Sequence, residues 1–448
     1  MKRLAALALS LLAACATQPD RPAPIRLDLP EMRSFVAQSP GPALRPNSEI
    51  AFDFLDLAFR MENGRELPIF TRFDEPVTVR VAGNVSETLV ADLTGLLARL
   101  RNEAQIDIRM TDAAQASITI EAIPNRTLQR VAPNAACFVV PRVRNWDELR
   151  TARNTPALDW GTLQRRERAA IFVPSDVAPQ EIRDCLHEEL AQALGPLNDL
   201  YRLPDSVFND DNIQAVLTGF DMLILRAYYA PELRNGMTKS EVASRLPGIL
   251  ARMNPRGQRS GGQIPSDTSR VWIAAMEIAL TDGTSDNGRR QAAARAIEIG
   301  RTLGWTGPRE GFANYAYGRL QLGNDSSLAL GAFNTANRVY RQSPTTDIHA
   351  AHIAVQLAAF TLTSGNAQAT IAITDEAIPI AQRHQNAALT ALLMMFKAEA
   401  LDLQGQTDAG MALRLDSLGW ARYGFGSREA VIDRLNEIAF LTPQTPPS

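Results

Sequence analysis

The sequence has few cysteines, no excess of positive charge and no long hydrophobic run after its first residues. Its 448 residues include three cysteines, and its formal net charge is -3. A slightly acidic chain with scattered Lys and Arg residues is a poor candidate for nucleic-acid binding. No apolar run beyond the N-terminus is long enough to cross a bilayer as a helix. With 45% hydrophobic and 21% charged residues, the chain is suited to two or three globular domains.

The first residues have the charge and hydropathy of a bacterial signal peptide. A Lys-Arg pair precedes the apolar run 4–12, which is too short for a permanent membrane span. The run leads into Leu-Ala-Ala-Cys at 12–15, which resembles the lipobox of bacterial lipoproteins. We therefore predict that residues 1–14 are removed and that Cys15 is lipidated. An ordinary secretory signal that happens to precede a cysteine is the alternative.

The residues after this cysteine indicate a tethered protein. Ala16 stands where an Asp would resemble an inner-membrane retention signal. We therefore expect a lipid anchor in the outer membrane, with the body of the protein facing the periplasm. Residues 15–50 are rich in proline and show little periodicity, which is typical of an extended spacer. The membrane is thus one predicted partner.

Two cysteines remain once the first is lipidated, namely Cys137 and Cys185. In an oxidising compartment an even pair predicts a disulfide, which would stabilise the fold by about 4 kcal/mol in the chain-entropy model. Two free buried thiols are the alternative. A catalytic thiol is disfavoured because the sequence contains no Cys-x-x-Cys motif and no obvious Cys/His pairing.

A first folded domain is predicted over residues 51–240. Its pattern begins with a strand, a helix and two strands, and a further strand and a long helix follow. This order argues for an α/β or α+β domain with a mixed sheet. The periodicity places strands at 76–82, 106–110, 117–122 and 170–173, and helices at 86–101 and 178–194.

The C-terminal part is predicted to be all-helical and repetitive. Residues 241–266 are expected to be a linker, and residues 267–440 repeat with a period of about 40 residues, which is typical of helical-hairpin solenoids. Four glycines mark the predicted loops: Gly283, Gly323, Gly365 and Gly405. The spacing of Ala329, Phe333 and Ala336 resembles that of tetratricopeptide repeats. An alanine-rich helical bundle without superhelical stacking is the alternative.

The stretch 185–199, CLHEELAQALGPLND, is the candidate site. Glu188 and Gln192 are four residues apart and therefore share one face of a helix. Gly195 can turn the chain so that Asn198 or Asp199 returns toward that face. Two side chains on a helix and a third after a glycine turn form the geometry of a metal site.

Zinc peptidases of the metzincin kind use His-Glu-x-x-His-x-x-Gly-x-x-His for this purpose. In the same register, Glu189 keeps the place of the general base and Gly195 keeps the glycine. The histidine positions are occupied by Glu188, Gln192 and Asn198. The stretch therefore resembles a metzincin helix in which the imidazole ligands have been replaced.

The likeness continues downstream. Residues 205–208 resemble the Met-turn of matrixin-type enzymes, with Phe208 in place of the methionine. Residues 217–229 resemble their closing helix, for which Thr218 is the expected N-cap. The resemblance implies an α+β metzincin-like domain, with a mixed sheet and an active-site-type helix, followed by an all-α solenoid similar to tetratricopeptide repeats.

These residues also resemble a proteobacterial family, domain of unknown function twenty-nine twenty-seven. Its members carry an EExxQ helix, an Asn-Asp pair after the glycine and a Ser-x-Phe-Asn-Asp turn. The matching positions are Glu188, Glu189, Gln192, Asn198, Asp199, Ser206, Phe208, Asn209 and Asp210. The C-terminal stretch 419–427 is also similar to that family. The family has no established activity, so the resemblance implies relatives and no reaction.

The replaced ligands disfavour zinc, which binds most tightly to imidazole and thiolate. His187 does not supply a pair, because Ala191 stands four residues later. Calcium accepts oxygen ligands but usually takes six or more, whereas Glu188, Gln192, Asn198 and Asp199 offer three or four. We expect no cofactor, and a divalent cation bound by these oxygen atoms is the alternative.

Two functions remain open. In the first, the protein is a lipoprotein that binds a protein or peptide through a non-catalytic, protease-derived domain and scaffolds partners on its helical repeats. In the second, it is a divergent metal-dependent hydrolase of peptidase type, with Glu189 as general base.

Overall fold

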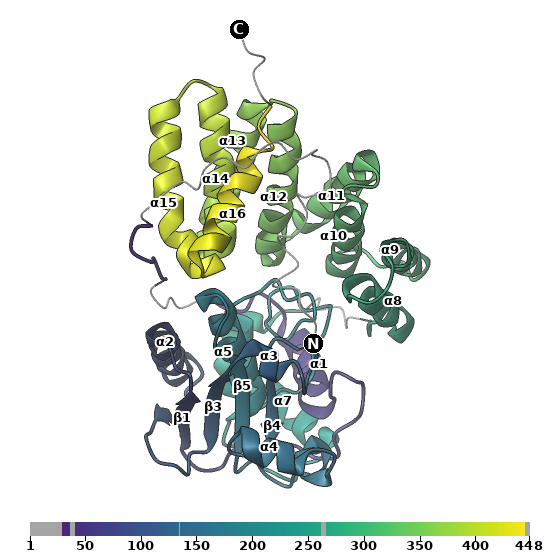
Figure 1. The fold of residues 1–448 in the computed structure, drawn as a ribbon. Coiled ribbons are helices and arrows are strands. Elements are labelled where there is room, and N and C mark those ends of the chain that lie inside the picture. The colour runs from purple at the N-terminus through teal and green to yellow at the C-terminus, as the bar shows by residue number, and fades with distance from the viewer. Residues whose placement is uncertain (1–28, 36–40, 134, 261–265, 444–448) are drawn as a thin grey trace. The chain divides into compact units, whose positions relative to one another are not determined.

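The computed structural model describes residues 29–35, 41–133, 135–260 and 266–443. The predicted signal peptide and Cys15 lie outside these residues. The chain divides into two compact units, which are described separately (Figure 1). Of the described residues, the first unit takes 41–133, 135–177, 182–260, 266 and 267. The second unit takes 29–35, 178–181 and 268–443. No described helix combines the length and the apolar character that crossing a membrane requires.

The first unit is built on a five-stranded mixed sheet with the order β2-β1-β3-β5-β4. Its strands are β1 (Val77–Gly83), β2 (Ile108–Met110), β3 (Ile118–Ile123), β4 (Phe138–Pro141) and β5 (Ala169–Pro174). Four of them overlap the predicted strands, and β4 was not predicted. The neighbours β1–β2, β1–β3 and β3–β5 are parallel, whereas β4 runs antiparallel to β5 and ends the sheet.

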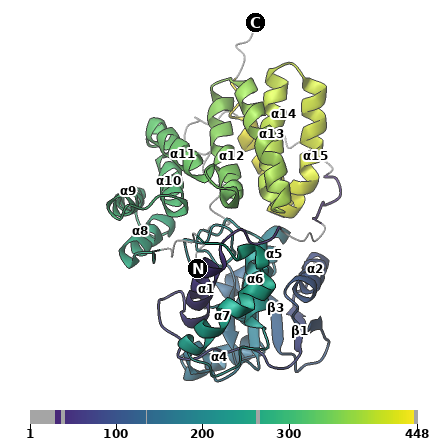
Figure 2. The same ribbon diagram turned by 180° about the vertical axis from the view of Figure 1, so that it is seen from behind.

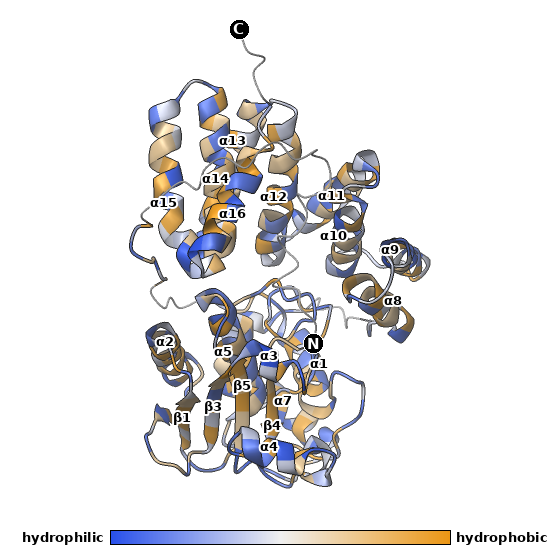
Figure 3. Ribbon diagram, viewed as in Figure 1, coloured by the Kyte–Doolittle hydropathy of each residue, from blue (hydrophilic) through white to orange (hydrophobic). Residues whose placement is uncertain are grey.

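Both faces of the sheet are covered, and β5 shows this most directly because all six of its residues are buried. Ile171 and Val173 belong to the main core, whereas Ala170 and Phe172 belong to a smaller cluster on the other face. This alternation follows from the two-residue period of a strand. Strands β3 and β5 are therefore mainly hydrophobic in sequence, as Figure 3 shows.

Six helices surround this sheet together with one short helical turn. They are α1 (Asn47–Phe59), α2 (Glu87–Glu103), α3 (Asn125–Leu128), α4 (Trp146–Ala152), α5 (Pro179–Leu194), α6 (Gly219–Tyr228) and α7 (Lys239–Met253). Helices α3 and α4 contribute to the smaller cluster, whereas α1, α2, α5, α6 and α7 contribute to the main core. Figure 2 shows α1, α5, α6 and α7 over one face of the sheet.

Two predicted boundaries differ from the structure. The predicted linker 241–266 contains most of α7, whose apolar face is buried in the main core because Val242, Leu246 and Leu250 recur at helical spacing. The predicted tether 15–50 contains the start of α1, where Ile50 is fully buried. The first domain therefore extends further at both ends than its sequence pattern indicated.

The second unit is helical from residue 268 to the end of its described part. Its helices are α8 (Arg270–Leu280), α9 (Asp286–Thr302), α10 (Pro308–Gln321), α11 (Ser326–Tyr340), α12 (Asp347–Thr363), α13 (Ala367–Arg383), α14 (Ala387–Leu403), α15 (Thr407–Phe425) and α16 (Arg428–Ala439). Each of the four predicted loop glycines lies between the two helices of a pair and has a positive φ angle, from 73° at Gly365 to 108° at Gly283. Glycine adopts this conformation without the steric penalty that a Cβ atom causes.

Candidate functional site

Helix α5 carries the predicted site in its C-terminal half, which packs into the main hydrophobic core. Its apolar positions are fully buried in the main core: Leu186, Leu190, Ala191 and Ala193. Glu189 is also fully buried and Gln192 is 3% exposed, whereas Glu188 is partly exposed. The helix therefore holds three polar side chains at the boundary of a well-packed interior.

Gly195 follows α5 and allows a close approach to α6. Its N–H donates to the carbonyl oxygen of Ala191 at 3.1 Å and so completes the last helical turn. A Cβ atom at this position would lie 2.9 Å from the ring of Tyr228. The φ angle of Gly195 is not positive. The glycine therefore supplies space for an aromatic ring, rather than a left-handed turn.

The chain reverses its direction after Gly195. The two polar residues predicted to return to α5, Asn198 and Asp199, contact different helices. Asp199 returns to α5, where Nε2 of Gln192 donates to its Oδ2 at 3.4 Å. Asn198 instead donates from Nδ2 to the carbonyl oxygen of Asp56 in α1 at 3.1 Å. The structure thus brings Asp199 to the candidate helix, whereas the amide of Asn198 fastens the loop to α1.

Carboxyl groups from several segments interact beside α5. Glu62, which follows α1, shares a hydrogen bond with Asp199. Burial, followed by the charges of Glu62 and Asp210, raises the pKa of Glu188 to about 8. Burial, followed by the charges of Glu62 and Glu188, raises the pKa of Asp199 well above its usual range. Both carboxyl groups therefore bind a proton more tightly than isolated carboxyl groups do.

Glu189, the predicted general base, is the central group of this cluster. Neither of its carboxylate oxygens has a hydrogen-bond partner of normal geometry among the described residues. Burial, followed by the charges of Glu188 and Glu62, raises its pKa well above the usual range, and the backbone N–H of Val139 in β4 opposes this rise. A raised pKa makes the carboxyl group harder to ionise, and a nearby positive charge would favour the ionised form that a general base requires.

His187 has a structural contact. Its Nδ1 accepts a hydrogen bond from the backbone N–H of Leu217 at 3.0 Å. Burial, together with the charges of Arg183 and Arg99, lowers its pKa well below the usual value. The neutral imidazole therefore fixes the segment that leads into α6.

The side chains around α5 do not suit zinc, whose sites rely on imidazole nitrogens or thiolates. The ring of His187 is bonded to the chain before α6, and the amide of Asn198 is bonded to α1. Over the described residues, no group of three or more His, Cys, Asp or Glu side chains is placed to hold a metal ion. No metal is assigned to these residues.

A disulfide connects the edge of the sheet to the candidate helix. The Sγ atoms of Cys137 and Cys185 are 2.06 Å apart and their Cα atoms are 5.9 Å apart. The pairing is the predicted one. Cys137 immediately precedes β4, and Cys185 stands one helical turn before Glu189. The bridge therefore fixes the edge strand next to the acidic cluster.

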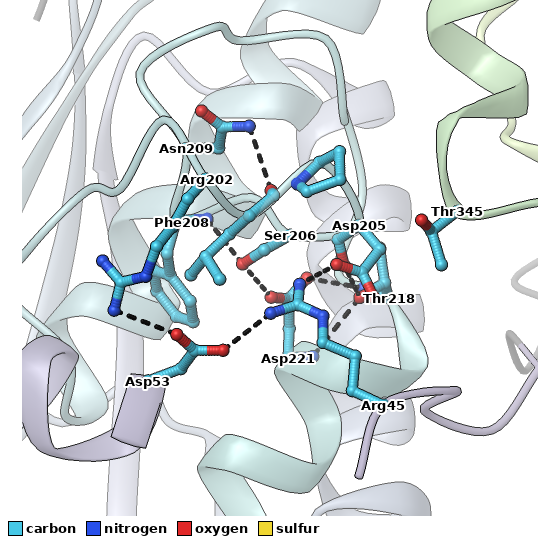
Figure 4. Close-up of polar contacts among 12 residues, drawn as sticks. Arg45, Asp53, Arg202, Asp205, Ser206, Phe208, Asn209, Thr218, Asp221 and Thr345 are labelled. Carbon is cyan, nitrogen blue, oxygen red and sulfur yellow. Dashed lines mark hydrogen bonds and ion pairs between the residues drawn. The ribbon is translucent and has the colours of Figure 1, made fainter. Parts of the chain in front are cut away.

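The predicted turn before α6 is organised around the carboxylate of Asp221 (Figure 4). Its oxygens accept hydrogen bonds from Oγ of Ser206 at 2.5 Å and from the backbone N–H groups of Val207 at 3.2 Å and Thr218 at 2.8 Å. Thr218 is the N-cap of α6, as expected. Burial raises the pKa of Asp221 to about 6, although these hydrogen bonds oppose the rise. Phe208 is fully buried in the main core.

A second charged network lies beside this turn and was not predicted from the sequence. Asp53 in α1 is fully buried and accepts ion pairs from Nη1 of Arg45 at 2.7 Å and from Nη2 of Arg202 at 2.9 Å. Arg45 also pairs with Asp205, as Figure 4 shows. Arg202 also pairs with Asp56. The sequence signal for this network is Asp53, which lies among the apolar residues of α1. A buried carboxylate needs a partner of opposite charge, so its position indicates an ion pair.

Comparison with known proteins adds one result to this geometry. Residues 47–248 match the family Protein of unknown function (DUF2927). A domain of this kind is therefore supported in the first unit. Comparisons with curated proteins and with solved structures gave no match.

The DUF2927 match encloses every residue of the candidate site. It begins at Asn47, the first residue of α1, and ends at Gly248 within α7. Both boundary helices bury apolar side chains in the main core, for example Phe54 and Leu246. The match and the packing therefore agree that α1 and most of α7 belong to this domain.

Proposed function

We propose that this protein is a lipid-anchored envelope protein that binds protein or peptide partners through a non-catalytic, metzincin-like domain. The helical hairpins of the second unit, which we relate to tetratricopeptide repeats, act as a scaffold for partners. Cys15 carries the lipid, and the body faces the periplasm from the outer membrane.

The observation that carries the proposal is the pairing of an edge strand with the acidic helix. Strand β4 ends the sheet, and the disulfide Cys137–Cys185 holds it to α5. The backbone N–H of Val139 in this strand is near enough to Glu189 to lower the pKa of its carboxyl group, against the rise that burial causes. An extended peptide can add to an edge strand through its main chain, and carboxyl groups beside that strand favour a basic side chain.

The chemistry of α5 supports binding over hydrolysis. A metzincin needs imidazole ligands for zinc and an ionised glutamate to activate water. Here the ligand positions carry Glu188, Gln192 and Asn198, and the pKa of Glu189 is well above its usual range. These replacements remove the imidazole ligands that a catalytic zinc ion would need.

A divergent hydrolase is the second candidate, and the buried carboxyl group of Glu189, whose oxygens have no hydrogen-bond partner of normal geometry among the described residues, favours it. Buried carboxyl groups with raised pKa values are typical of catalytic acids. Metal analysis of the purified full chain, with turnover of peptide and peptidoglycan fragments by the wild type and Glu189→Gln, separates the candidates. We expect no stoichiometric metal and no turnover. Metal at one equivalent with turnover that Glu189→Gln abolishes would establish the hydrolase instead.

Peptide binding is tested with an arrayed library of unstructured peptides and the variant Val139→Pro. Proline removes the outward N–H of the edge strand and is tolerated at sheet edges. We expect retained peptides to be rich in Lys or Arg and to bind at least about 10-fold more weakly to the variant, the equivalent of 1.4 kcal/mol. Unchanged binding by a variant with an intact circular dichroism spectrum would rule out strand addition at β4.

The anchor is tested by metabolic labelling with a radioactive fatty acid. The wild-type chain is expected to incorporate the label and to sediment with outer membranes. Cys15→Ala is expected to lose both properties, because a lipobox without its cysteine has no acceptor for the acyl chains. Label incorporation by Cys15→Ala would contradict the assignment.

A further inference from the structure

The extended segment 29–35, which was predicted to be part of a spacer, lies along α15. Leu29 packs against the apolar cluster formed by the last helices. The backbone N–H of Arg33 donates to the carbonyl oxygen of Gly419 at 3.0 Å. Nη1 of Arg422 donates to the carbonyl oxygen of Pro30 at 2.6 Å. Both views of the ribbon draw this purple segment beside α15 (Figures 1 and 2).

Two side chains of the segment make specific contacts with α15. Nη2 of Arg33 lies 2.5 Å from Oδ1 of Asp416, and its guanidinium carbon lies 5.6 Å from the centre of the Trp420 ring. The ring of Phe35 stacks on Trp420 with their centres 4.5 Å apart. An arginine and an aromatic ring two residues later are thus recognised by one acid and one indole.

The helix surface is shaped to receive a peptide backbone. Asp416, Gly419 and Trp420 are spaced by three and four residues and so share one face of α15. A Cβ atom on Gly419 would lie 2.9 Å from Cγ of Arg33 and 3.2 Å from the carbonyl oxygen of Glu31. Glycine at this position therefore permits the close approach. We call the surface formed by Asp416, Gly419, Trp420 and Arg422 the strap site.

We propose that the strap site is a binding site for extended peptides that carry an arginine two residues before an aromatic side chain, and that residues 29–35 occupy it as an intramolecular ligand. This inference rests on the proposed peptide-binding function and gives it a second site with a defined ligand. A partner segment of the same chemistry binds by displacing residues 29–35.

The contacts suit a ligand that can be displaced. The side chains of Arg33 and Asp416 are 50% and 40% exposed, and exposed ion pairs contribute little to stability. The segment competes mainly because it is covalently attached, which gives it an effective concentration on the order of millimolar. The apparent affinity of a free peptide is therefore lowered by competition with the attached segment, rather than by weak contacts with the strap site.

The test uses a fluorescent synthetic peptide with the sequence of residues 29–35 and the full chain. In the double variant Arg33→Ala, Phe35→Ala the attached segment loses its two specific side chains, so the site is released. We expect the peptide to bind this variant at least about 10-fold more tightly than the wild type, because the competitor is weakened. Adding Trp420→Ala to the released chain is expected to abolish binding.

A charge reversal controls for loss of fold. In the released chain, Asp416→Arg should reject the native peptide and accept one in which the arginine is replaced by Asp, because the ion pair is restored with opposite polarity. Equal affinity of the peptide for wild-type and released chains, or binding that ignores Asp416 and Trp420, would overturn the proposal. Binding here without binding at β4 would instead refute only the function proposed for the first domain.

Discussion

The interiors of the two units differ in the side chains that they bury. The paired helices of the second unit meet through small side chains, and Ala316, Ala358 and Ala398 are all nearly or fully buried at equivalent positions of their repeats. The first unit buries charged groups such as Asp53, Arg202 and Glu189 beside its apolar core. A repeat can therefore be understood from its own 40 or so residues, whereas the first domain depends on contacts between distant segments.

The largest expected effect comes from removing the buried carboxylate that organises the turn before α6. Asp221→Ala leaves the donors of Ser206, Val207 and Thr218 without their acceptor, so the first unit should lose about 3–5 kcal/mol of stability. Urea unfolding followed by hydrogen exchange of each unit measures this loss. Ser364→Ala, at the exposed end of α12, is the matched control and should stay within about 0.5 kcal/mol of the wild type. A similar loss in the second unit would contradict the division between the units.

The next effect comes from the disulfide. The bridge closes a span of 48 residues in the first unit. Replacing both cysteines with alanine should lower the unfolding free energy of that unit by about 2–4 kcal/mol, because the unfolded chain gains conformational freedom. Thermal unfolding with and without reductant measures the loss. Reductant should leave the double variant and the second unit unchanged, and a shift in either would point to another cause.

A smaller effect depends on pH. The pKa of Glu188 is raised from 4.5 to about 8, so the folded state holds a proton that the unfolded state releases. This contribution to stability is complete below pH 4.5 and is lost as the pH rises toward 8. Glu188→Gln removes the titrating group, and the decline in stability from pH 5 to 9 should shrink by at least about 1.4 kcal/mol, the value of one pKa unit.

The control for this pH series is Glu298→Gln in α9. Hydrogen bonding to Arg301 lowers the pKa of this exposed group, so it titrates below the measured range. Urea midpoints at each pH give the comparison. An equal change of slope in both variants would show that the acidic cluster of the first unit has no special role.

The smallest effects test whether the stability of a repeat depends on the backbone conformation of its own residues. Gly405 has a φ angle of 75° and open space around its Cα atom, so Gly405→Ala should cost about 1 kcal/mol through backbone strain alone. Gly331, inside α11, also faces open space but lacks a positive φ angle. Gly331→Ala should stabilise the second unit by about 0.5–1 kcal/mol. Calorimetry measures the change in stability of each variant. Changes of equal sign would show that the φ angle of the glycine does not decide the effect of adding a Cβ atom at these two positions.

Much of this architecture could be predicted because its signals are local. The strands β1, β3 and β5 and the helices α2 and α5 follow from periodicity, and the loop glycines follow from the repeat. The disulfide followed from the parity of the cysteines. Strand β4 was missed because its four residues carry too short a pattern. Helix α7 was missed because a proline, Pro247, lies within it.

The candidate site could be predicted only in part. The spacing of Glu188 and Gln192 placed them on one helix face, and the return of Asp199 followed from the chain reversal expected there. The contact of Asn198 with α1, the bond of His187 to Leu217 and the role of Glu62 were not evident. Each of these depends on a segment far away in the sequence, which no local pattern encodes.

The sequence alone determined the order of elements, the positions of the repeat loops and the pairing of the cysteines, because these depend on side-chain period, backbone freedom and residue count. Only the tertiary structure decided which polar groups are buried together and how strongly burial changes their protonation. The free energy of a buried charge depends on every neighbouring dipole and charge, and those neighbours come from distant parts of the chain.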